Sequence, residues 1–394
     1  MLNFCEIFDY PIYVVGGCVR DKLLGLEGKD VDIASDLEPQ KFKDLCRKLK
    51  IRTVDTGIEH GTVTAIINHV PYEHTTFRED VSNDGRNATI KFSKTIEEDL
   101  SRRDFTINAI AMLEDKIIDP FGGQADLKNR ILRTVGDPQE RFSEDYLRII
   151  RAARFQARFN LTLAEGLQDP AVKLSSRIMN HVSIERITDE FKKAKLHGSS
   201  FIQSAQDLGF LQYILPEFLS LDEKQYNIWL NEIRCSQNLS ELLYFTSLFL
   251  PLETNNAEAI ARKFKLSNHT SRGVSLFEKH DQDLNNTEFR YKELRRLKIN
   301  LKQYFDDFTT RLKSVRLTSD LEKKNLEFIS LYSEQIDRSI KSPFVNGGFL
   351  KESGLTPGPY FKEILDKAGE AQASGKNQQE VEALTNRLIK RHKS

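Results

Sequence analysis

Two aspartates separated by one residue, Asp30 and Asp32, follow closely after a pair of glycines, Gly16 and Gly17. If Asp30-Val31-Asp32 is a strand, both carboxylates lie on one face, because strand side chains alternate between faces. The glycines let the backbone turn tightly and approach a ligand, and a helix that starts after them offers free N–H groups to an anion. A phosphate cradle that faces two carboxylates is what a metal-dependent, nucleotide-handling enzyme needs. On its spacing alone, the aspartate pair is also compatible with a solvated loop.

A third carboxylate is expected on a neighbouring strand. Two divalent metal ions that activate an attacking hydroxyl and stabilise a leaving pyrophosphate need about three carboxylates between them. Glu73, in the segment Tyr72-Glu73-His74, is the best candidate. Taken alone, it is equally compatible with an exposed strand residue.

Two further segments carry arginines that could bind the rest of a nucleotide. Arg102 and Arg103 precede an expected helix start near Asn108, where their forked donors could hold phosphates or a base edge. Asp104 or Thr106 could cap that helix. A charged surface turn is the alternative interpretation of this segment.

The second segment spaces Asp145, Arg148, Arg151 and Arg154 three residues apart. On a helix each of these side chains neighbours the next. Asp145 can accept hydrogen bonds and Arg148 can donate them, so together they can address the Watson–Crick edge of a base. Arg151 and Arg154 can reach a triphosphate. The alternative is a solvated helix face with internal salt bridges.

The elements that must position these residues change in character along the chain. The first part, residues 11 to about 135, is predicted to hold strands at 12–15, 31–34, 62–67, 71–77, 88–92 and 116–118, and helices at 19–24, 39–49 and 108–112. From residue 138 onward, apolar residues recur at helical spacing, for example over 142–159, 182–196 and 227–250. We therefore predict an α+β head followed by a helical remainder.

Composition narrows the class of protein further. With 394 residues the chain is too long for one compact core. The formal net charge of zero argues against indiscriminate polyanion binding but allows a local basic groove. We expect no membrane span and no secretory signal. The four cysteines form no CxxC pair, so we expect no zinc site and free thiols in the cytoplasm.

Taken together and in order, the motifs resemble those of class II tRNA nucleotidyltransferases, which belong to the polymerase β nucleotidyltransferase superfamily. The resemblance is carried by Gly16-Gly17-Cys18-Val19-Arg20-Asp21 with Asp30-Val31-Asp32, by 102–109, by Asp119-Pro120-Phe121-Gly122-Gly123, by Glu144-Asp145-Tyr146-Leu147-Arg148 and by 182–191. The segment 354–359 is similar to the tail of bacterial CCA-adding members.

The resemblance implies a nucleotidyltransferase head with a mixed β-sheet and flanking helices, then an all-α neck, body and tail. We place the catalytic head at 1–137, the neck for base recognition at 138–200, the body at 201–275 and a tRNA-binding tail at 276–394. No obligate protein partner is expected.

The resemblance also implies a reaction and the roles of named residues. The tRNA 3′ hydroxyl would attack the α-phosphate of CTP or ATP and release pyrophosphate. Asp30 and Asp32 would hold two Mg²⁺ ions, with Glu73 as the third carboxylate. Asp145 and Arg148 would select C or A without a nucleic-acid template. The nucleotide would further contact Gly16, Gly17, Arg20, Arg103, Arg151 and Arg154.

Three alternatives to a CCA-adding enzyme stay open at this stage. An enzyme that adds only the terminal A and a bacterial poly(A) polymerase share these motifs. A non-catalytic RNA-binding protein on the same scaffold is the alternative of another class. The segment 79–91 is of full length, as in members of the family that add the terminal A.

Overall fold

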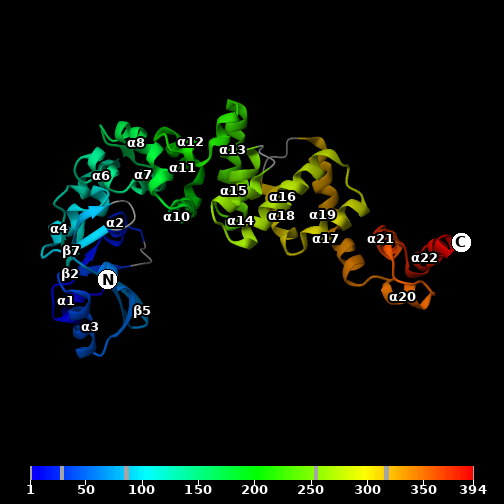
Figure 1. Cartoon of the computed structure of the whole chain (residues 1–394), viewed down its shortest axis with the longest axis horizontal. Helices are drawn as coiled ribbons and strands as arrows, with labels where there is room; N and C mark the ends of the chain where they lie inside the picture. The colour runs from blue at the N-terminus through cyan, green and yellow to red at the C-terminus, as the bar shows by residue number, and fades with distance from the viewer. Residues whose placement is uncertain (1, 27–30, 84–87, 253–255, 315–318, 394) are drawn as a thin grey trace. The chain divides into compact units, whose positions relative to one another are not determined.

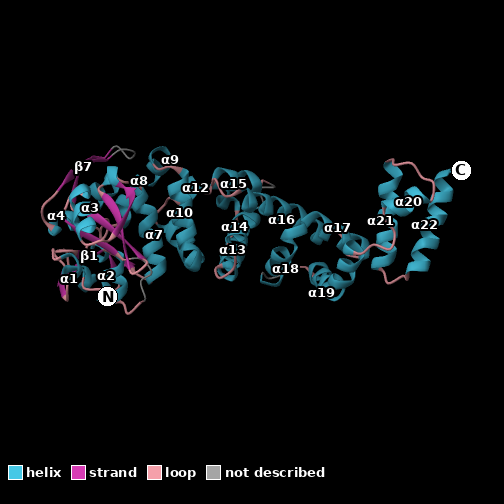
Figure 2. Ribbon diagram, turned by 90° about the horizontal axis from the view of Figure 1, so that it is seen from below, coloured by secondary structure: helices cyan, strands magenta, loops and turns pink. Residues whose placement is uncertain are grey.

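The computed structural model describes residues 2–26, 31–83, 88–252, 256–314 and 319–393 (Figure 1). The chain divides into two compact units, residues 1–221 and 222–394. The first unit mixes strands with helices, and the described residues of the second form helices joined by turns and loops, without a strand (Figure 2). This confirms the predicted fold class of an α+β head with a helical remainder. The finer division into head, neck, body and tail stays a prediction.

A seven-stranded sheet in the order β3-β4-β5-β2-β1-β8-β9 lies at the centre of the head. Only β2 and β5 pair in parallel among these neighbours; the other described pairs are antiparallel. The sheet is therefore mixed, as predicted. Its strands are β1 (Tyr13–Val15), β2 (Asp32–Ser35), β3 (Arg52–Gly57), β4 (Thr62–Ile67), β5 (Val70–Thr76), β8 (Ala111–Leu113) and β9 (Lys116–Ile118).

Helices and two small sheets complete the first unit. The small sheets pair β6 (Arg78–Asn83) with β7 (Ala88–Phe92) and β10 (Ile131–Leu132) with β11 (Thr162–Leu163). The helices are α1 (Phe4–Phe8), α2 (Gly17–Leu23), α3 (Pro39–Lys48), α4 (Ile96–Ser101), α5 (Gly123–Asn129), α6 (Pro138–Glu144), α7 (Leu147–Phe159), α8 (Gln168–Leu174), α9 (Ile178–His181), α10 (Ile184–Ala194), α11 (Gly198–Asp207) and α12 (Leu211–Ile214).

A buried histidine holds β5 against α3. The ring of His74 stacks on Phe42 of α3, with ring centroids 3.7 Å apart, and its Nε2 lies 2.7 Å from the Ser35 hydroxyl of β2. Because burial disfavours the charged imidazole, the pKa of His74 falls to about 3. The ring is therefore neutral and structural, and it fixes the strand that carries Glu73.

The predicted helix at 108–112 is wrong. Thr106–Asn108 forms a single 3₁₀ turn, and Ala111–Leu113 continues as β8, which pairs with β1. A short apolar run that is buried on every side fits a strand as well as a helix. The hydroxyl of Thr106 does not cap a helix but donates to Asp126 at 2.7 Å.

The segment 142–159, where apolar residues recur at helical spacing, is helical but does not form one helix. It consists of α6 and α7, and Asp145 between them is extended, with φ −150° and ψ 103°. Asp145 therefore does not share a helix with Arg148. The span 227–250 likewise divides into α13 (Glu223–Ser236) and α14 (Glu241–Phe249).

The second unit consists of packed helices around apolar cores. One such core includes Leu350, Ile364, Ala368 and Val381 near the C-terminus. No described helix combines the length and apolarity needed to cross a membrane. The α-helices are α13 (Glu223–Ser236), α14 (Glu241–Phe249), α15 (Ala257–Lys263), α16 (Asn268–Asn286), α17 (Tyr291–Leu301), α18 (Phe305–Ser314), α19 (Asp320–Lys341), α20 (Gly347–Glu352), α21 (Pro359–Ala373) and α22 (Gln378–Lys393).

Candidate active site

Asp32 and Glu73 lie beside each other on the central sheet. Their strands β2 and β5 are parallel neighbours, and the register pairs Asp32 directly with Glu73. Paired residues on adjacent strands present their side chains to the same face, and both residues are exposed. Carboxylate oxygens are the ligands that Mg²⁺ prefers, so this pair fits a divalent cation. Asp30, the third predicted carboxylate, lies outside the described residues.

The glycine turn stands at the same end of β2 as Asp32. The end of β1 meets the start of β2, because the two strands are antiparallel. Gly16 leaves β1 with φ 71° and ψ −126° and caps α2. The thiol of Cys18 then contacts the backbone oxygen of Asp32 at 3.9 Å. The turn is thus brought beside Asp32, as the sequence predicts.

Arg103 packs over the glycine turn. A Cβ atom built on Gly16 would overlap the guanidinium of Arg103. That guanidinium donates to Asp99 at 3.0 Å and to the backbone oxygen of Asn108 at 3.3 Å. Burial by itself would raise the pKa of Asp99, but the guanidiniums of Arg103 and Arg102 outweigh burial and lower that pKa. Asp99 is therefore ionised and holds both arginines.

Arg20 of α2 is buried against α7. Its guanidinium donates to Asp21 at 2.6 and 2.8 Å and lies 4.6 Å from the ring centre of Phe159 and 5.3 Å from that of Phe155. Burial lowers the pKa of Arg20 although Asp21 opposes the shift. Arg20 thus joins the glycine turn to α7, while its contact with a nucleotide stays a prediction.

Asp145 and Arg148 are each held by a neighbouring charged residue. Asp145 accepts from the backbone N–H of Leu147 at 3.1 Å and from Arg186 of α10 at 2.7 Å. Arg148 donates to Glu144 at 2.5 Å. The sequence did not single out Arg186 for a role, although it stands in the 182–191 motif. Only the structure reveals its part, through its ion pair with Asp145, which lies 41 residues away in the sequence.

The side chain of Arg148 also binds backbone oxygens, one of them in the head. It donates to the carbonyl oxygens of Arg141 at 2.9 Å and of Arg102 at 3.1 Å. Arg102 directly precedes Arg103, and both side chains form ion pairs with Asp99. Arg148, predicted to select the base, therefore contacts the neighbour of Arg103, which is predicted to bind phosphate. The two arginine segments that the sequence singled out are thus adjacent in space.

Arg151 and Arg154 point to buried carboxylates. Arg151 donates to Asp104 at 2.7 Å, and Arg154 donates to Glu190 of α10 at 2.5 Å. Burial would raise the pKa of Asp104 and of Glu190, but the adjacent arginines lower both below their ordinary values. The side chain of Arg151 is 30 % exposed and that of Arg154 only 7 %. Their contact with phosphate stays a prediction.

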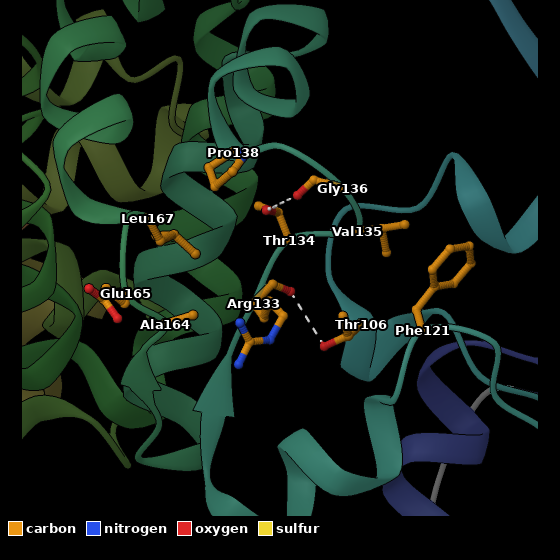
Figure 3. Close-up of a pocket in the computed structure, with 10 residues that line it drawn as sticks. All are labelled: Thr106, Phe121, Arg133, Thr134, Val135, Gly136, Pro138, Ala164, Glu165 and Leu167. Carbon is orange, nitrogen blue, oxygen red and sulfur yellow. Dashed lines mark hydrogen bonds between the residues drawn. The ribbon is translucent and has the colours of Figure 1, made fainter.

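A separate cavity of about 240 Å³ adjoins the segment that follows Arg103 (Figure 3). The Thr106 hydroxyl at its wall donates to Asp126 at 2.7 Å and lies 3.5 Å from the carbonyl oxygen of Arg133. The walls of the cavity are formed by residues other than those predicted for the site, namely Thr106, Phe121, Arg133, Thr134, Val135, Gly136, Pro138, Ala164, Glu165 and Leu167.

Comparison with known sequences identifies relatives over almost the whole chain. Residues 12–133 match the poly A polymerase head domain. The chain is 35% identical over 393 residues to the CCA-adding enzyme of Levilactobacillus brevis, covering 98% of this chain and 95% of that protein. It is 34% identical over 395 residues to the CCA-adding enzyme of a Geobacillus species, covering 97% and 94%.

Comparison with solved structures agrees with the sequence relatives. The crystal structure of the Bacillus stearothermophilus CCA-adding enzyme in complex with CTP superposes with a TM-score of 0.79 and 28% identity, covering 99% of this chain and 98% of that one. The Thermotoga maritima CCA-adding enzyme complexed with tRNA shares the fold, with a TM-score of 0.66 at 22% identity, covering 97% and 93%.

Proposed function

This chain belongs to the family of CCA-adding enzymes, and we propose that it adds C, C and A in turn to the 3′ end of tRNA, using CTP and ATP and no nucleic-acid template. The observation that carries the proposal is the pairing of Asp32 with Glu73 beside the glycine turn. Carboxylates that can hold metal ions and a glycine turn that can bind phosphates lie at the same end of β2. Arg103, which can neutralise phosphate charge, packs against that turn.

In the proposed reaction, the oxygen of the tRNA 3′ hydroxyl forms a bond to the α-phosphorus of the nucleotide. The bond from that phosphorus to the bridging oxygen breaks, pyrophosphate leaves, and the hydroxyl proton is released. Asp32 and Glu73, together with Asp30, would hold two Mg²⁺ ions, which would activate the hydroxyl and stabilise the leaving pyrophosphate. Gly16, Gly17 and Arg103 would bind the phosphates.

Selection of the base is assigned to Asp145 and Arg148. A base held by good paired hydrogen bonds is discriminated by about 1–3 kcal/mol per pair. Such pairing requires side chains with fixed orientations. Arg186 and Glu144 supply this restraint, since each forms an ion pair with one member of the predicted pair.

The alternatives have less support. The relatives that match almost end to end are named CCA-adding enzymes, which disfavours a poly(A) polymerase. A non-catalytic RNA-binding protein would not need Asp32 and Glu73 in register. We further propose the division into head, neck, body and tail given above, and action in the cytoplasm.

The test uses three tRNAs, which end before the CCA sequence, after its first C, or after both. Each is incubated with CTP and ATP, singly and together. We expect C on the first two tRNAs and A on the third. An enzyme that adds only A would leave the first two unchanged, and a poly(A) polymerase would extend them with repeated A.

The catalytic assignment is tested with Asp32→Asn and Glu73→Gln. Each change should lower incorporation by at least about 100-fold, since loss of a group in the outer shell of a metal site already costs 10–100-fold, while tRNA binding persists. Asp44→Asn, which changes a half-buried aspartate of α3 that pairs with Arg47, is the matched control and should keep full activity. Retained incorporation by the Asp32 and Glu73 variants would reject the assignment.

A further inference from the structure

A run of side-chain hydrogen bonds begins where α2 meets α7. Arg158 of α7 donates to one oxygen of Asp21 at 3.1 Å. Arg20 donates to the other oxygen of Asp21 and, through Nη1, to Oδ1 of Asn108 at 2.5 Å. Arg20 and Asn108 are 4 % and 6 % exposed, so this part of the run is shielded from water.

The same run continues from Asn108 to α10. Nδ2 of Asn108 donates to Oδ1 of Asp104 at 2.9 Å, and Oδ2 of Asp104 accepts from Arg151 at 2.6 and 2.7 Å. Arg151 lies 3.9 Å from Glu190, which also accepts from Arg154. The helix that follows the glycine turn is thus linked to the arginine row of α7 by side chains alone.

Asn108 is the neutral junction between the two charged halves of this run. Its amide accepts a hydrogen bond from a cation and donates one to an anion at the same time, which neither a carboxylate nor a guanidinium can do. Its backbone oxygen also accepts from Arg103, which covers Gly16. Every polar atom of the Asn108 side chain is therefore committed to one of the two halves.

We propose that Asn108 is a positioning residue, which fixes the glycine turn of α2 relative to the arginine row of α7. The proposal rests on the proposed function, in which the turn takes the phosphates and the side chains around α7 take the base. A single nucleotide must satisfy both halves at once, and small errors in such placement are costly. A ligand that contacts the glycine turn alone does not depend on the distance between the turn and α7.

The test variant is Asn108→Asp, with the same shape as the native side chain. It keeps an acceptor for Arg20 but places a second carboxyl group where the amide stands 2.9 Å from Asp104. Two carboxyl groups this close cannot both ionise easily, so one pKa of the pair rises strongly. The charged groups that face them are the guanidiniums of Arg20, Arg103, Arg148, Arg151 and Arg154, whose positive charge opposes this rise. When the pair carries one proton, that proton can replace the hydrogen bond that the Asn108 amide donates to Asp104. When both carboxyl groups are ionised, they repel each other.

Three measurements are made on the full chain at pH 8 and pH 6: the KM for CTP, the kcat, and the Ki of inorganic tripolyphosphate as a competitor. At pH 8 the KM of Asn108→Asp for CTP should rise about 10-fold, equivalent to about 1.4 kcal/mol, while the Ki changes less than about 2-fold. At pH 6 the KM should return toward that of the unaltered protein. Asn108→Ala removes both side-chain bonds, so its KM should stay high at both pH values.

Asn129→Asp, an exposed change at the end of α5, is the control and should behave as the unaltered protein. If Asn108→Asp does not fold, Asn108→Ser carries the comparison and should show the same split between KM and Ki. The inference is overturned if KM and Ki rise together, or if KM stays at the unaltered value at pH 8. No incorporation by the unaltered protein would instead reject the proposed function.

Discussion

Alanine at Gly16 should destabilise the head, whereas alanine at Gly17 should not. Gly16 has φ 71° and ψ −126°, a region that a residue with a Cβ atom rarely adopts. The added methyl group would also overlap the Arg103 guanidinium. At Gly17, by contrast, the nearest atom to a new Cβ is Nη2 of Arg20 at 3.5 Å, an ordinary contact.

The size of the effect follows from the backbone. A residue held in a sparsely populated conformation costs about 1–3 kcal/mol. In a unit of this size, 1 kcal/mol shifts the melting temperature by about 2–4 °C. Gly16→Ala should therefore melt about 4–8 °C lower for a cost of about 2 kcal/mol. Gly17→Ala should be neutral or slightly stabilising, since alanine is favoured over glycine within a helix by about 0.5–1 kcal/mol.

Calorimetry of the melting transition and titration with CTP separate stability from binding. Gly16→Ala should lose both, because Arg103 must move away from the turn. Gly17→Ala should keep its stability, so any loss of CTP affinity there measures contact between the nucleotide and this residue. The reasoning is refuted if Gly16→Ala melts within about 1 °C of the unaltered protein, or if Gly17→Ala melts as low as Gly16→Ala.

Three other predictions concern base choice, product length and pH. Arg186→Ala frees Asp145 from its ion pair and should shift the ratio of kcat/KM for CTP over ATP by about 5-fold or more, as should Arg148→Ala; an unchanged ratio would reject their part in base selection. Deletion of residues 80–88 should stop the product at CC on a sequencing gel, and full CCA would show the segment to be dispensable. Because the folded pKa of His74 lies far below its unfolded value of 6.5, the stability from its neutral ring is present above pH 6.5 and is lost as the pH falls toward 3; urea unfolding at pH 7 and pH 5 should show a loss of about 2 kcal/mol that His74→Gln removes.

The carboxylate pair shows what a sequence can and cannot predict about this site. Alternation along a strand explains why Asp32 points away from the buried Ile33. Strand boundaries at Thr62–Ile67 and Lys116–Ile118 were also predicted correctly. The pairing of Asp32 with Glu73 depends on the parallel register of β2 and β5, and register is set by packing between distant segments.

The wrong helix at 108–112 and the break within 142–159 have different physical causes. Residues 109–112 are all buried, so their apolar run carries no period that distinguishes a strand from a helix. The break at Asp145 has another origin. Its carboxylate accepts from the backbone of Leu147 and from Arg186, and aspartate favours such local bonds over the helical conformation. The partner that stabilises the break comes from another helix, which no local pattern reveals.

Assigning arginines to phosphate from their spacing alone overlooks the acids that face them. In the described part of the first unit, Arg151 and Arg154 each face a buried carboxylate, Asp104 and Glu190. Glu190 also pairs with the exposed Lys193, so neither guanidinium of this pair lacks an opposite charge.

Arg102 and Arg103, by contrast, share the single carboxylate of Asp99. One positive charge of this pair is therefore left over, and it stands beside Gly16. A triphosphate is attracted by uncompensated charge, and a balanced ion pair contributes little to that field. We therefore expect Arg103→Ala to weaken CTP binding more than Arg154→Ala, which the same titration with CTP would measure.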